Sequence, residues 1–341
     1  MLTDSFGRTI RYLRVSVTDR CNLFCRYCRL STEEILPNNK EILDFDELVR
    51  LLRIFLELGI ERIRLTGGEP LLRRNLVGLV RTVSRLPGLQ ELTLTTNALL
   101  LERYAAALQA AGLRRVNISL DSLDPDIFDT ITRREGAAPT PGTGLPAVLA
   151  GIAAAIRVGL HPVKVNMVVM RGINDHEIPA MVLFAQQQGV LLRFIETMPI
   201  GEAGVGMTDH FMPAEEILAR IHHHFGSQLL PATADKDAGP ARYFSRAGTE
   251  AAIGVISARS QHFCSSCNRM RLTAKGNLVY CLGRQDRMDL KSLLRTGASD
   301  AELKTAIRAA VDLKPERHAF AMQEGATPHS AIHAAMSALG G

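Results

Sequence analysis

The sequence predicts an α/β protein in which successive βα units are followed by a smaller C-terminal annex. Two observations lead to this prediction. Short β-rich runs alternate with helical patterns about every 30 residues between residues 13 and 197, as expected for βα units. The chain has 341 residues, enough for one barrel of about 200–250 residues with an annex, or for two ordinary domains.

Six runs rich in β-branched or large apolar residues are the strand candidates. They are Leu13–Val17, Arg62–Thr66, Glu91–Thr95, Arg115–Leu120, Val163–Val169 and Leu191–Glu196. The clearest helices between them are Asp46–Leu58, in which leucines recur on one face, and Asp175–Gln188, which follows an Asn-Asp cap signal.

A glycine separates a helical pattern from the next strand at four places, where a left-handed C-cap suits glycine. These residues are Gly59, Gly112, Gly159 and Gly189. The alternation is typical of a parallel α/β barrel or sheet.

Composition shifts divide the rest of the chain. Glu135–Gly144 is rich in Pro, Gly and Thr and predicts a surface loop. A helix at about Pro213–Phe225 precedes a linker-like stretch, Pro231–Pro240, so we expect a barrel domain at residues 1–230 and the annex at 231–341. The annex is expected to contain two short strands and two helices, within Ala241–Ser257 and at about Leu290–Arg295 and Asp300–Asp312.

The overall composition excludes several classes of protein. Hydrophobic residues make up 46% and charged residues 22%, which excludes disorder, collagen and coiled coil. Lys and Arg number 40 against 35 Asp and Glu, and the net charge of +5 suggests an anionic partner without identifying it. The longest uncharged apolar stretch, Leu145–Ile156, is shorter than the roughly 18 residues of a membrane span. Residues 1–11 lack a secretory h-region, so we expect a cytoplasmic protein with reduced thiols.

All six cysteines fall into two sets of three, spaced C-x3-C-x2-C and C-x2-C-x13-C. The first set is Cys21, Cys25 and Cys28, and the second is Cys264, Cys267 and Cys281. In a reducing compartment this clustering favours metal binding, and thiolates suit iron–sulfur clusters and zinc. Each set has one thiolate fewer than a closed four-cysteine site, so one coordination position would stay open.

Two kinds of metal centre are compatible with the second set. A structural zinc ion would use a histidine such as His262 as its fourth ligand, whereas an iron–sulfur cluster would leave a position open. The first set directly follows the first strand, and no histidine lies between residues 1 and 28. The first set therefore favours a cluster.

The run Cys21–Cys28 (CNLFCRYC), with Thr66–Pro70 (TGGEP) after the second strand, resembles the radical S-adenosylmethionine (SAM) superfamily. The resemblance implies an incomplete TIM-type (βα)6 barrel, whose lateral opening the annex would partly cover. It also implies a [4Fe–4S] cluster whose fourth iron binds SAM, which is reduced to a 5′-deoxyadenosyl radical. Because Gly67 and Gly68 lack side chains, we expect their carbonyls to approach the ammonium group of a ligand closely.

Over essentially the whole chain the sequence is similar to the GTP 3′,8-cyclase family of molybdenum cofactor biosynthesis. The shared features are the spacing of the second cysteine set, the run Cys267–Thr273 (CNRMRLT) and the terminal Gly340 and Gly341. The resemblance implies that the second set holds a second [4Fe–4S] cluster whose free iron meets guanine, and that the two glycines enter the active site and assist catalysis. The implied reaction converts GTP to (8S)-3′,8-cyclo-7,8-dihydroguanosine 5′-triphosphate and begins with hydrogen abstraction from the ribose C3′.

The resemblance also assigns single residues, many of them at strand ends, where parallel barrels place their catalytic face. Those implied to contact SAM are Tyr27, Gly68, Ser119 and Met198. Those implied to contact GTP are Arg14, Arg64, Thr95, Lys164, Arg269, Met270 and Arg271. Five of these residues are basic, which suits a triphosphate, and the chain contains no G-x4-G-K-[ST] loop that could cradle phosphate instead.

Several motif residues have simpler interpretations. Thr95 and Ser119 are equally compatible with helix caps, and Met198 with filling of the core. The run His222–His224 fans out around a helix, so we expect a solvated helix end there rather than a metal site.

Two departures from the family pattern affect loop shape rather than ligands. Ala98 stands where the family usually has glycine, and Arg29-Leu30 replaces the common Met-Pro after the third cysteine.

The resemblance implies further partners and leaves two alternatives. It implies an external electron donor, a homodimer and transfer of the product to cyclic pyranopterin monophosphate synthase, with neither nucleic acid nor membrane as a partner. A radical SAM maturase that modifies peptides and has an auxiliary cluster is the alternative enzyme, but it gives Arg269, Arg271 and the Gly-Gly end no role. A zinc-stabilised nucleic-acid-binding module is the alternative outside enzymes, but no basic block of five or six residues supports it.

Overall fold

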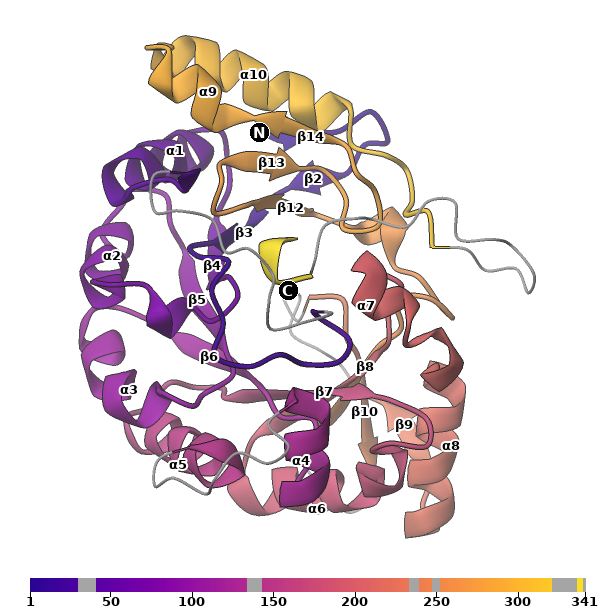
Figure 1. Ribbon diagram of the computed structural model, residues 1–341. Helices are drawn as coiled ribbons and strands as arrows, with labels where there is room; N and C mark the ends of the chain where they lie inside the picture. The colour runs from indigo at the N-terminus through magenta and orange to yellow at the C-terminus, as the bar shows by residue number, and fades with distance from the viewer. Residues whose placement is uncertain (30–40, 134–142, 233–238, 247–251, 321–335, 340–341) are drawn as a thin grey trace.

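Six parallel strands form the wall of a partial barrel, with helices around the outside (Figure 1). The computed structural model describes residues 1–29, 41–133, 143–232, 239–246, 252–320 and 336–339. The six strands are β3 (Tyr12–Ser16), β4 (Arg62–Thr66), β5 (Glu91–Thr96), β6 (Arg115–Ser119), β7 (Lys164–Val169) and β8 (Leu191–Glu196). Each agrees with a predicted strand to within one residue, and the incomplete (βα)6 barrel is confirmed.

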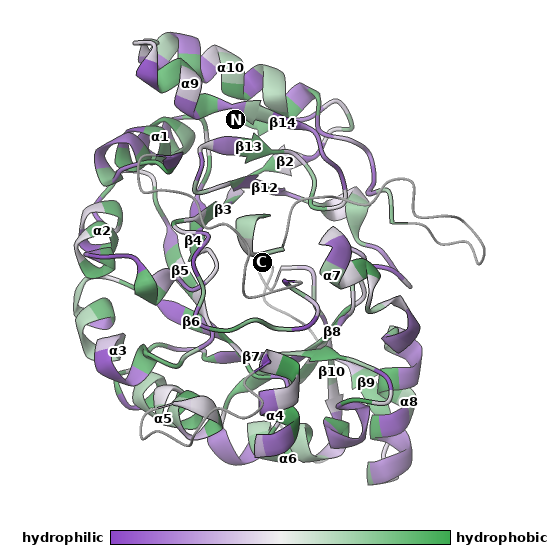
Figure 2. Ribbon diagram, in the orientation of Figure 1, coloured by the Kyte–Doolittle hydropathy of each residue, from purple (hydrophilic) through white to green (hydrophobic). Residues whose placement is uncertain are grey.

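Amphipathic helices connect the strands and cover the barrel. They are α1 (Phe45–Glu57), α2 (Leu76–Val83), α3 (Leu101–Ala110), α4 (Pro125–Thr132), α5 (Gly144–Arg157) and α6 (Ile178–Gln188), with the 3-10 turns η2 (Pro70–Leu72) and η3 (Asp175–Glu177). Helix α1 begins at a capping box in which Asp44 accepts from the Glu47 amide and Glu47 accepts from the Asp44 amide. Figure 2 shows both hydrophobic and hydrophilic residues along these helices, as expected for elements between a core and solvent.

The predicted helix Asp175–Gln188 is divided in the structure. Its first turn is the 3-10 turn η3, and α6 follows with a proline in its first turn. Proline lacks an amide hydrogen and is therefore tolerated at the start of an α-helix but not in its interior.

The annex extends the barrel wall at both edges. Strand β12 (Arg269–Leu272) pairs parallel to β3, and β11 (Ala252–Ile256) pairs parallel to β8. Antiparallel strands continue the sheet outward as β13 (Asn277–Val279), β14 (Arg287–Asp289), β10 (Arg242–Arg246) and β9 (Leu229–Pro231). The described residues thus form one twelve-stranded sheet and a separate hairpin of β1 (Leu2–Thr3) and β2 (Thr9–Ile10).

The remaining helices belong to the second half of the chain. They are α7 (Gly201–Val205), α8 (Ala214–Phe225), α9 (Leu290–Arg295), α10 (Asp300–Asp312) and α11 (Met336–Leu339), with the 3-10 turns η4 (Thr208–His210) and η5 (Cys264–Ser266). Helices α9 and α10 have the predicted bounds. Figure 1 shows α11 inside the ring of strands.

Other sequence expectations are confirmed or fall outside the described residues. The four punctuating glycines all have positive φ, from 64° to 103°. The run His222–His224 is exposed at the end of α8, as expected. Almost all of the predicted loop Glu135–Gly144, and residues 233–238 of the linker-like stretch, lie outside the described residues. No helix in the described part of the chain has the length and apolar character needed to span a bilayer.

We expect Leu52→Ala to destabilise the fold strongly. Leu52 lies in α1 and is 0% exposed, within the core between helix and barrel. Truncating a buried leucine lowers the free energy of unfolding by about 2–5 kcal/mol, because contacts are lost and a cavity remains. The measurement is urea denaturation of purified protein, in which the change in unfolding free energy is taken from the shift of the midpoint at an unchanged m-value. The matched control is Leu183→Ala in α6, which is 41% exposed and should change the unfolding free energy by only about 0.5 kcal/mol; equal losses in the two variants would contradict the assigned core.

Candidate functional site

The first cysteine set lies in the loop after β3. The amides of Cys28 and Arg29 both donate to the Cys25 carbonyl, at 2.8 and 3.1 Å, and form a tight turn. The loop is fastened to α4 by the Phe24 amide, which donates to the Thr132 carbonyl at 3.2 Å, and by the neighbouring amide of residue 26. These main-chain bonds hold three half-buried cysteines at the carboxyl end of the barrel strands.

The thiols of the first set lie close enough to influence one another. Burial raises the pKa of Cys25 well above its usual value, and Asp121, Cys28 and Cys21 raise it further. Burial also raises the pKa of Cys21 to about 11. Within the described residues, no group of three or more His, Cys, Asp or Glu side chains is close enough to hold a single metal ion. Converging cysteines in a partly apolar loop fit an iron–sulfur cluster, whose metal charge would keep them ionised.

The glycines of the TGGEP run are required by the packing of the protein itself. A Cβ atom on Gly68 would lie 2.3 Å from the Arg20 carbonyl oxygen, and one on Gly67 would lie 2.5 Å from the Thr18 carbonyl oxygen. The Gly68 amide donates to that Thr18 oxygen at 2.7 Å. These glycines therefore allow the loop after β4 to pack on the cluster loop, and the expected approach of a ligand to their carbonyls stays a prediction.

Glu69 connects the TGGEP turn to the loop after β5. Its buried carboxylate accepts from the Leu71 amide at 3.0 Å, the Thr96 hydroxyl at 2.8 Å and the Asn97 amide at 2.8 Å. Burial raises the pKa of Glu69 to about 7, although these bonds oppose the shift. The Asn97 side chain in turn donates to Asn22 at 2.8 Å, so the loops after β3, β4 and β5 form one bonded unit.

Ala98 keeps the loop shape that glycine would give. It adopts φ 64°, a left-handed conformation that costs an L-residue about 1–2 kcal/mol. Its side chain is fully buried, beside Gly151 of α5. The other departure, Arg29, is buried with its guanidinium 5.0 Å from the centre of the Phe24 ring, and residue 30 lies outside the described residues.

Tyr27 is held by a residue that the sequence argument missed. Its hydroxyl donates to Oδ2 of Asp121 at 2.7 Å, and Oδ1 of Asp121 accepts from the Val168 amide at 2.8 Å. Burial raises the pKa of Asp121 to about 6. The signal was present in the sequence, because Asp121 comes two residues after Ser119 at the end of a strand.

Thr95, Ser119 and Met198 lie at strand ends, as predicted. The helices that follow have Leu100 and Asp124 as N-caps, so neither Thr95 nor Ser119 caps a helix. Met198 follows β8 and is partly buried. It packs against the apolar cluster described below rather than filling the main core.

A row of cations lines one side of the barrel interior. Arg14 on β3 is in register with Arg64 on β4 and with Arg271 on β12. The residues flanking Arg14, Leu13 and Val15, are fully buried in the outer core, so the arginines face the other way. We call Arg14, Arg64 and Arg271 the cation row; two of its members are 257 residues apart in sequence and adjacent in the sheet.

The cations near this row repel one another. Burial lowers the pKa of Arg14 well below its usual value, and Arg271 and Arg64 lower it further. Burial, followed by Arg269, lowers the pKa of Arg271 to about 10. Burial also lowers the pKa of Lys164 on β7 to about 7. Clustered buried cations are unfavourable without anions, and a polyanionic ligand would relieve the repulsion.

Several polar atoms at this site have no protein partner. Among the described residues, Arg14 Nε, Thr95 Oγ1 and Arg269 Nε are buried and make no hydrogen bond. Buried donors left unpaired destabilise a protein, so their occurrence together indicates a place for a ligand with acceptor oxygens. Met270 differs from its two neighbours because its side chain is 1% exposed and belongs to the core, which leaves its main chain for any ligand contact.

Arg193 is a further buried cation that the sequence argument missed. It lies on β8, and its Nε donates to Oδ1 of Asn166 at 2.9 Å. Burial lowers its pKa to about 10, with Arg64 and Arg115 adding to the shift. A single charge in the apolar run Leu191–Ile195 was the available signal.

The second cysteine set lies between the annex strands. Cys264 opens η5, Cys267 directly precedes the turn into β12, and Cys281 follows β13. Burial raises the pKa of Cys281, and the neighbouring Cys267 and Cys264 add to the shift. Burial would also raise the pKa of Cys267, but Lys314 and nearby arginines hold it below the usual value. The three thiols converge in a cationic setting, which fits a thiolate-bound cluster.

One apolar cluster connects the first cysteine set with the surroundings of the second. Its buried members are Ile200, Ala258, Val279, Phe320, Met336 and Leu339. Packed against it are Cys28 of the first set, Met198, and Phe263 and Leu282, which are the sequence neighbours of Cys264 and Cys281. Two of its buried members, Met336 and Leu339, belong to α11, which lies inside the ring of strands (Figure 1).

Helix α11 also contacts the cation row. Nη1 of Arg271 donates to the Leu339 carbonyl at 3.4 Å. Gly340 and Gly341 lie outside the described residues, so their predicted role stays a prediction. The contact at Leu339 brings the chain to the cation row immediately before them.

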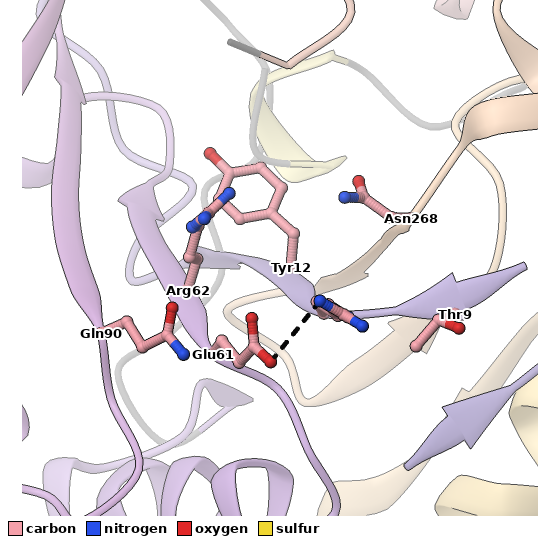
Figure 3. A pocket seen from close by; sticks show the side chains of 7 residues that line it. Thr9, Tyr12, Glu61, Arg62, Gln90 and Asn268 are labelled. Carbon is pink, nitrogen blue, oxygen red and sulfur yellow. Dashed lines mark ion pairs between the residues drawn. The ribbon is translucent and has the colours of Figure 1, made fainter. Parts of the chain in front are cut away.

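A cavity of about 500 Å³ opens at the amino ends of the strands (Figure 3). One of its lining residues, Asn268, directly follows Cys267 of the second set. The lining also includes Arg11 and Glu61, an ion pair at 3.9 Å, and Tyr12, whose ring centre is 5.4 Å from the guanidinium carbon of Arg64 in the cation row. Since parallel barrels carry out chemistry at the carboxyl ends of their strands, we place the candidate site at the first cysteine set and the cation row rather than in this cavity.

Two family models match the chain. The model of the radical SAM superfamily matches residues 15–185, and the model described as Molybdenum Cofactor Synthesis C matches residues 190–320. The first match contains the first cysteine set, the end of β3 and the strands β4 to β7, and the second contains β8 and the whole second set.

Curated relatives match over nearly the whole chain. A GTP 3′,8-cyclase of Hydrogenovibrio crunogenus is 50% identical over 321 residues, which cover 94% of each chain. A GTP 3′,8-cyclase of Moorella thermoacetica is 45% identical over 317 residues, which cover 93% of this chain and 95% of the relative. Among solved structures, Streptococcus suis SuiB bound to precursor peptide SuiA superposes with a TM-score of 0.58 at 14% identity and covers 89% of this chain and 67% of SuiB. That likeness concerns the fold alone.

Proposed function

Because the chain belongs to the GTP 3′,8-cyclase family of radical SAM enzymes, we propose that its two cysteine sets and the cation row form one active site for SAM and GTP. The activity is that of a GTP 3′,8-cyclase in molybdenum cofactor biosynthesis. Radical SAM membership implies a [4Fe–4S] cluster and SAM. The observation that carries the single-site proposal is the apolar cluster that packs against Cys28 and against the sequence neighbours of Cys264 and Cys281.

The first cysteine set and the adjoining loops would hold the initiating cluster and SAM. Cys21, Cys25 and Cys28 would bind three irons, and Met198 lies against the same apolar cluster as Cys28. Asp121 would fix Tyr27 through the 2.7 Å hydrogen bond to its hydroxyl. When bound, the cluster held by Cys21, Cys25 and Cys28 would supply the electron for reductive cleavage of SAM, the chemistry by which the family starts the reaction at the ribose of GTP. The apolar cluster and α11 would exclude water from the site.

The cation row would bind the triphosphate. Planar guanidinium groups match phosphate oxygens in pairs, and the unpaired Nε atoms of Arg14 and Arg269 would gain acceptors. Lys164 would add a positive charge from β7, and Thr95 would offer its free hydroxyl. Binding at the triphosphate would hold the ribose and base at a fixed distance from SAM.

The second cysteine set would hold a second [4Fe–4S] cluster, with guanine completing its open position. The converging thiols and the cations beside Cys267 support this assignment over a zinc ion completed by His262, which is exposed. As the family implies, we also propose a homodimer in the cytoplasm, an external electron donor, and transfer of the product to cyclic pyranopterin monophosphate synthase.

One anaerobic incubation tests the proposal. Reconstituted protein is mixed with GTP, SAM and dithionite, and mass spectrometry follows 5′-deoxyadenosine and a cyclised nucleotide. We expect both products in equal amounts. Formation of 5′-deoxyadenosine with a precursor peptide but not with GTP would overturn the proposal in favour of a peptide maturase, and zinc in place of iron at the second set would overturn the second cluster.

We expect GTP affinity to fall with pH above about 7 because of Lys164. Burial and the neighbouring Arg115, Arg193 and Arg64 lower the pKa of Lys164 to about 7. The triphosphate favours the charged form, so above that pH binding takes up a proton, and affinity should drop by up to about tenfold per pH unit. Below pH 7 the amine is already charged, and this contribution levels off.

The measurement is the dissociation constant of GTP at several pH values, without SAM. Lys164→Arg is the matched control, because arginine stays charged over this range. It should bind GTP with little pH dependence above 7, while Lys164→Met should bind weakly at every pH. Parallel pH profiles for the unaltered protein and Lys164→Arg would rule out the titration of Lys164 as the cause.

A further inference from the structure

A buried lysine outside the implied ligand set lies beside the second cysteine set. Lys314 follows the end of α10 and is only 3% exposed. Its Nζ donates to the Tyr280 carbonyl at 2.7 Å, and residue 280 directly precedes Cys281. No carboxylate in the described part of the chain pairs with this ammonium group. A buried cation without a counter-ion is unfavourable unless a nearby group supplies negative charge.

Lys314 acts electrostatically on cysteines of the second set. Lys314 favours the thiolate form of both Cys267 and Cys281. It is therefore close to two cysteines that reach the site from different strands, β12 and β13. Its hydrogen bond holds the strand that presents the third cysteine, and its charge faces the ligands themselves.

The segment that carries Lys314 is fastened to the other half of the set by Arg8. The buried Arg8 guanidinium donates from Nη2 to the Pro315 carbonyl at 2.7 Å and from Nη1 to the Glu316 carbonyl at 2.8 Å. The same Nη1 donates to the Cys264 carbonyl at 2.9 Å. Asp4 neutralises Arg8 through a 2.6 Å ion pair, so Arg8 acts mainly by holding these main-chain segments together. Lys314, in contrast, contributes a net positive charge.

We propose that Lys314 is a positioning and charge-compensating residue for the second cluster: it fixes the Cys281 strand and stabilises the reduced, more negative form of the cluster. The inference rests on the proposed presence of that cluster. It follows from electrostatics, because reduction adds one negative charge and a buried cation that acts on the sulfur ligands favours the added electron. Lys314 raises the reduction potential of the second cluster.

Lys314→Gln separates charge from hydrogen bonding. Glutamine keeps a donor for the Tyr280 carbonyl but has no charge, so we expect two clusters per chain and a more negative potential for the second one. Lys314→Arg should restore the unaltered potential. Lys304→Gln is the control: Lys304 is a lysine of α10 that pairs with Glu57 at 2.6 Å and lies partly exposed. It should shift neither potential.

The test is a redox titration of the fully reconstituted protein, followed by electron paramagnetic resonance. Adding SAM alters the signal of the first cluster and so identifies the second. Iron content and thermal unfolding show whether each variant folds and holds both clusters.

The outcomes separate the inference from the proposed function. A second-cluster potential that is unchanged in Lys314→Gln, with two clusters present, overturns the role of Lys314 alone. Equal shifts in Lys314→Gln and Lys314→Arg overturn the charge argument. Unaltered protein that binds iron only at the first set overturns both the second cluster and the inference. If Lys314→Gln fails to fold, Lys314→Met, which also removes the charge, decides instead: a more negative second-cluster potential supports the proposal, and an unchanged potential with two clusters present refutes it.

Discussion

Replacing Cys25 by Ala is expected to abolish reductive cleavage of SAM. Cys25 is the central thiol of the first set, and its carbonyl accepts two amides that shape the cluster loop. Alanine keeps that main-chain turn but removes a ligand, so the initiating cluster loses one of its three protein anchors. 5′-Deoxyadenosine should fall to the level of a reaction without protein, measured by mass spectrometry after anaerobic incubation with dithionite.

Cys281→Ala is the matched control for this loss. It removes a thiol of the second set and should leave 5′-deoxyadenosine formation intact, while GTP binds more weakly and no cyclised nucleotide forms. Together the two variants test whether the first set is needed for SAM cleavage and the second for GTP binding. Normal 5′-deoxyadenosine yield from Cys25→Ala would refute the initiating role, and unchanged GTP affinity in Cys281→Ala would argue against guanine binding at the second set.

Deleting Gly340 and Gly341 is expected to stop formation of the cyclised nucleotide while both clusters remain. Helix α11 ends at Leu339, whose carbonyl accepts from Arg271 in the cation row. The expectation rests on this contact, which is made by the residue directly before the two glycines, and on the family resemblance, which implies that the glycines assist catalysis. Removing them takes away no cysteine and none of the cations.

The measurements are iron content, 5′-deoxyadenosine and cyclised nucleotide for the truncated chain. Iron should be unchanged, and SAM should still be cleaved without product, which separates catalysis from assembly. Replacing the pair by two alanines is a useful control, because it restores length and adds only two methyl groups. Full activity of the truncated chain would show that the two glycines have no catalytic part.

The barrel could be predicted from the sequence because its signals are local. Six apolar runs marked the strands, and four glycines marked the ends of helices. Both signals can be read without knowledge of distant contacts. The capping box at Asp44 and Glu47 is equally local. The pairing of β11 and β12 with the two barrel edges could not be predicted in the same way, because these partners are more than fifty residues apart in sequence.

The candidate site was predicted in part for the same reason. The cysteine spacings lie within short segments, so the two sets could be recognised by pattern. The sequence signals for Asp121 and Arg193 were weak, and Lys314 had none, because the importance of these residues comes from burial and from partners on other elements. The structure adds a reason for the two glycines of the TGGEP run, since a side chain there would collide with the cluster loop.

The order of synthesis decides how long the edge strands of the barrel stay without their sheet partners. Strand β3 emerges first among the barrel strands, yet its outer neighbour β12 is made about 250 residues later. The edge of β8 is covered sooner, by β11, whereas β3 presents unpaired backbone groups until β12 has been made. Such an open edge is a template for association with other chains, so the nascent barrel is exposed to pairing with its copies for most of its synthesis.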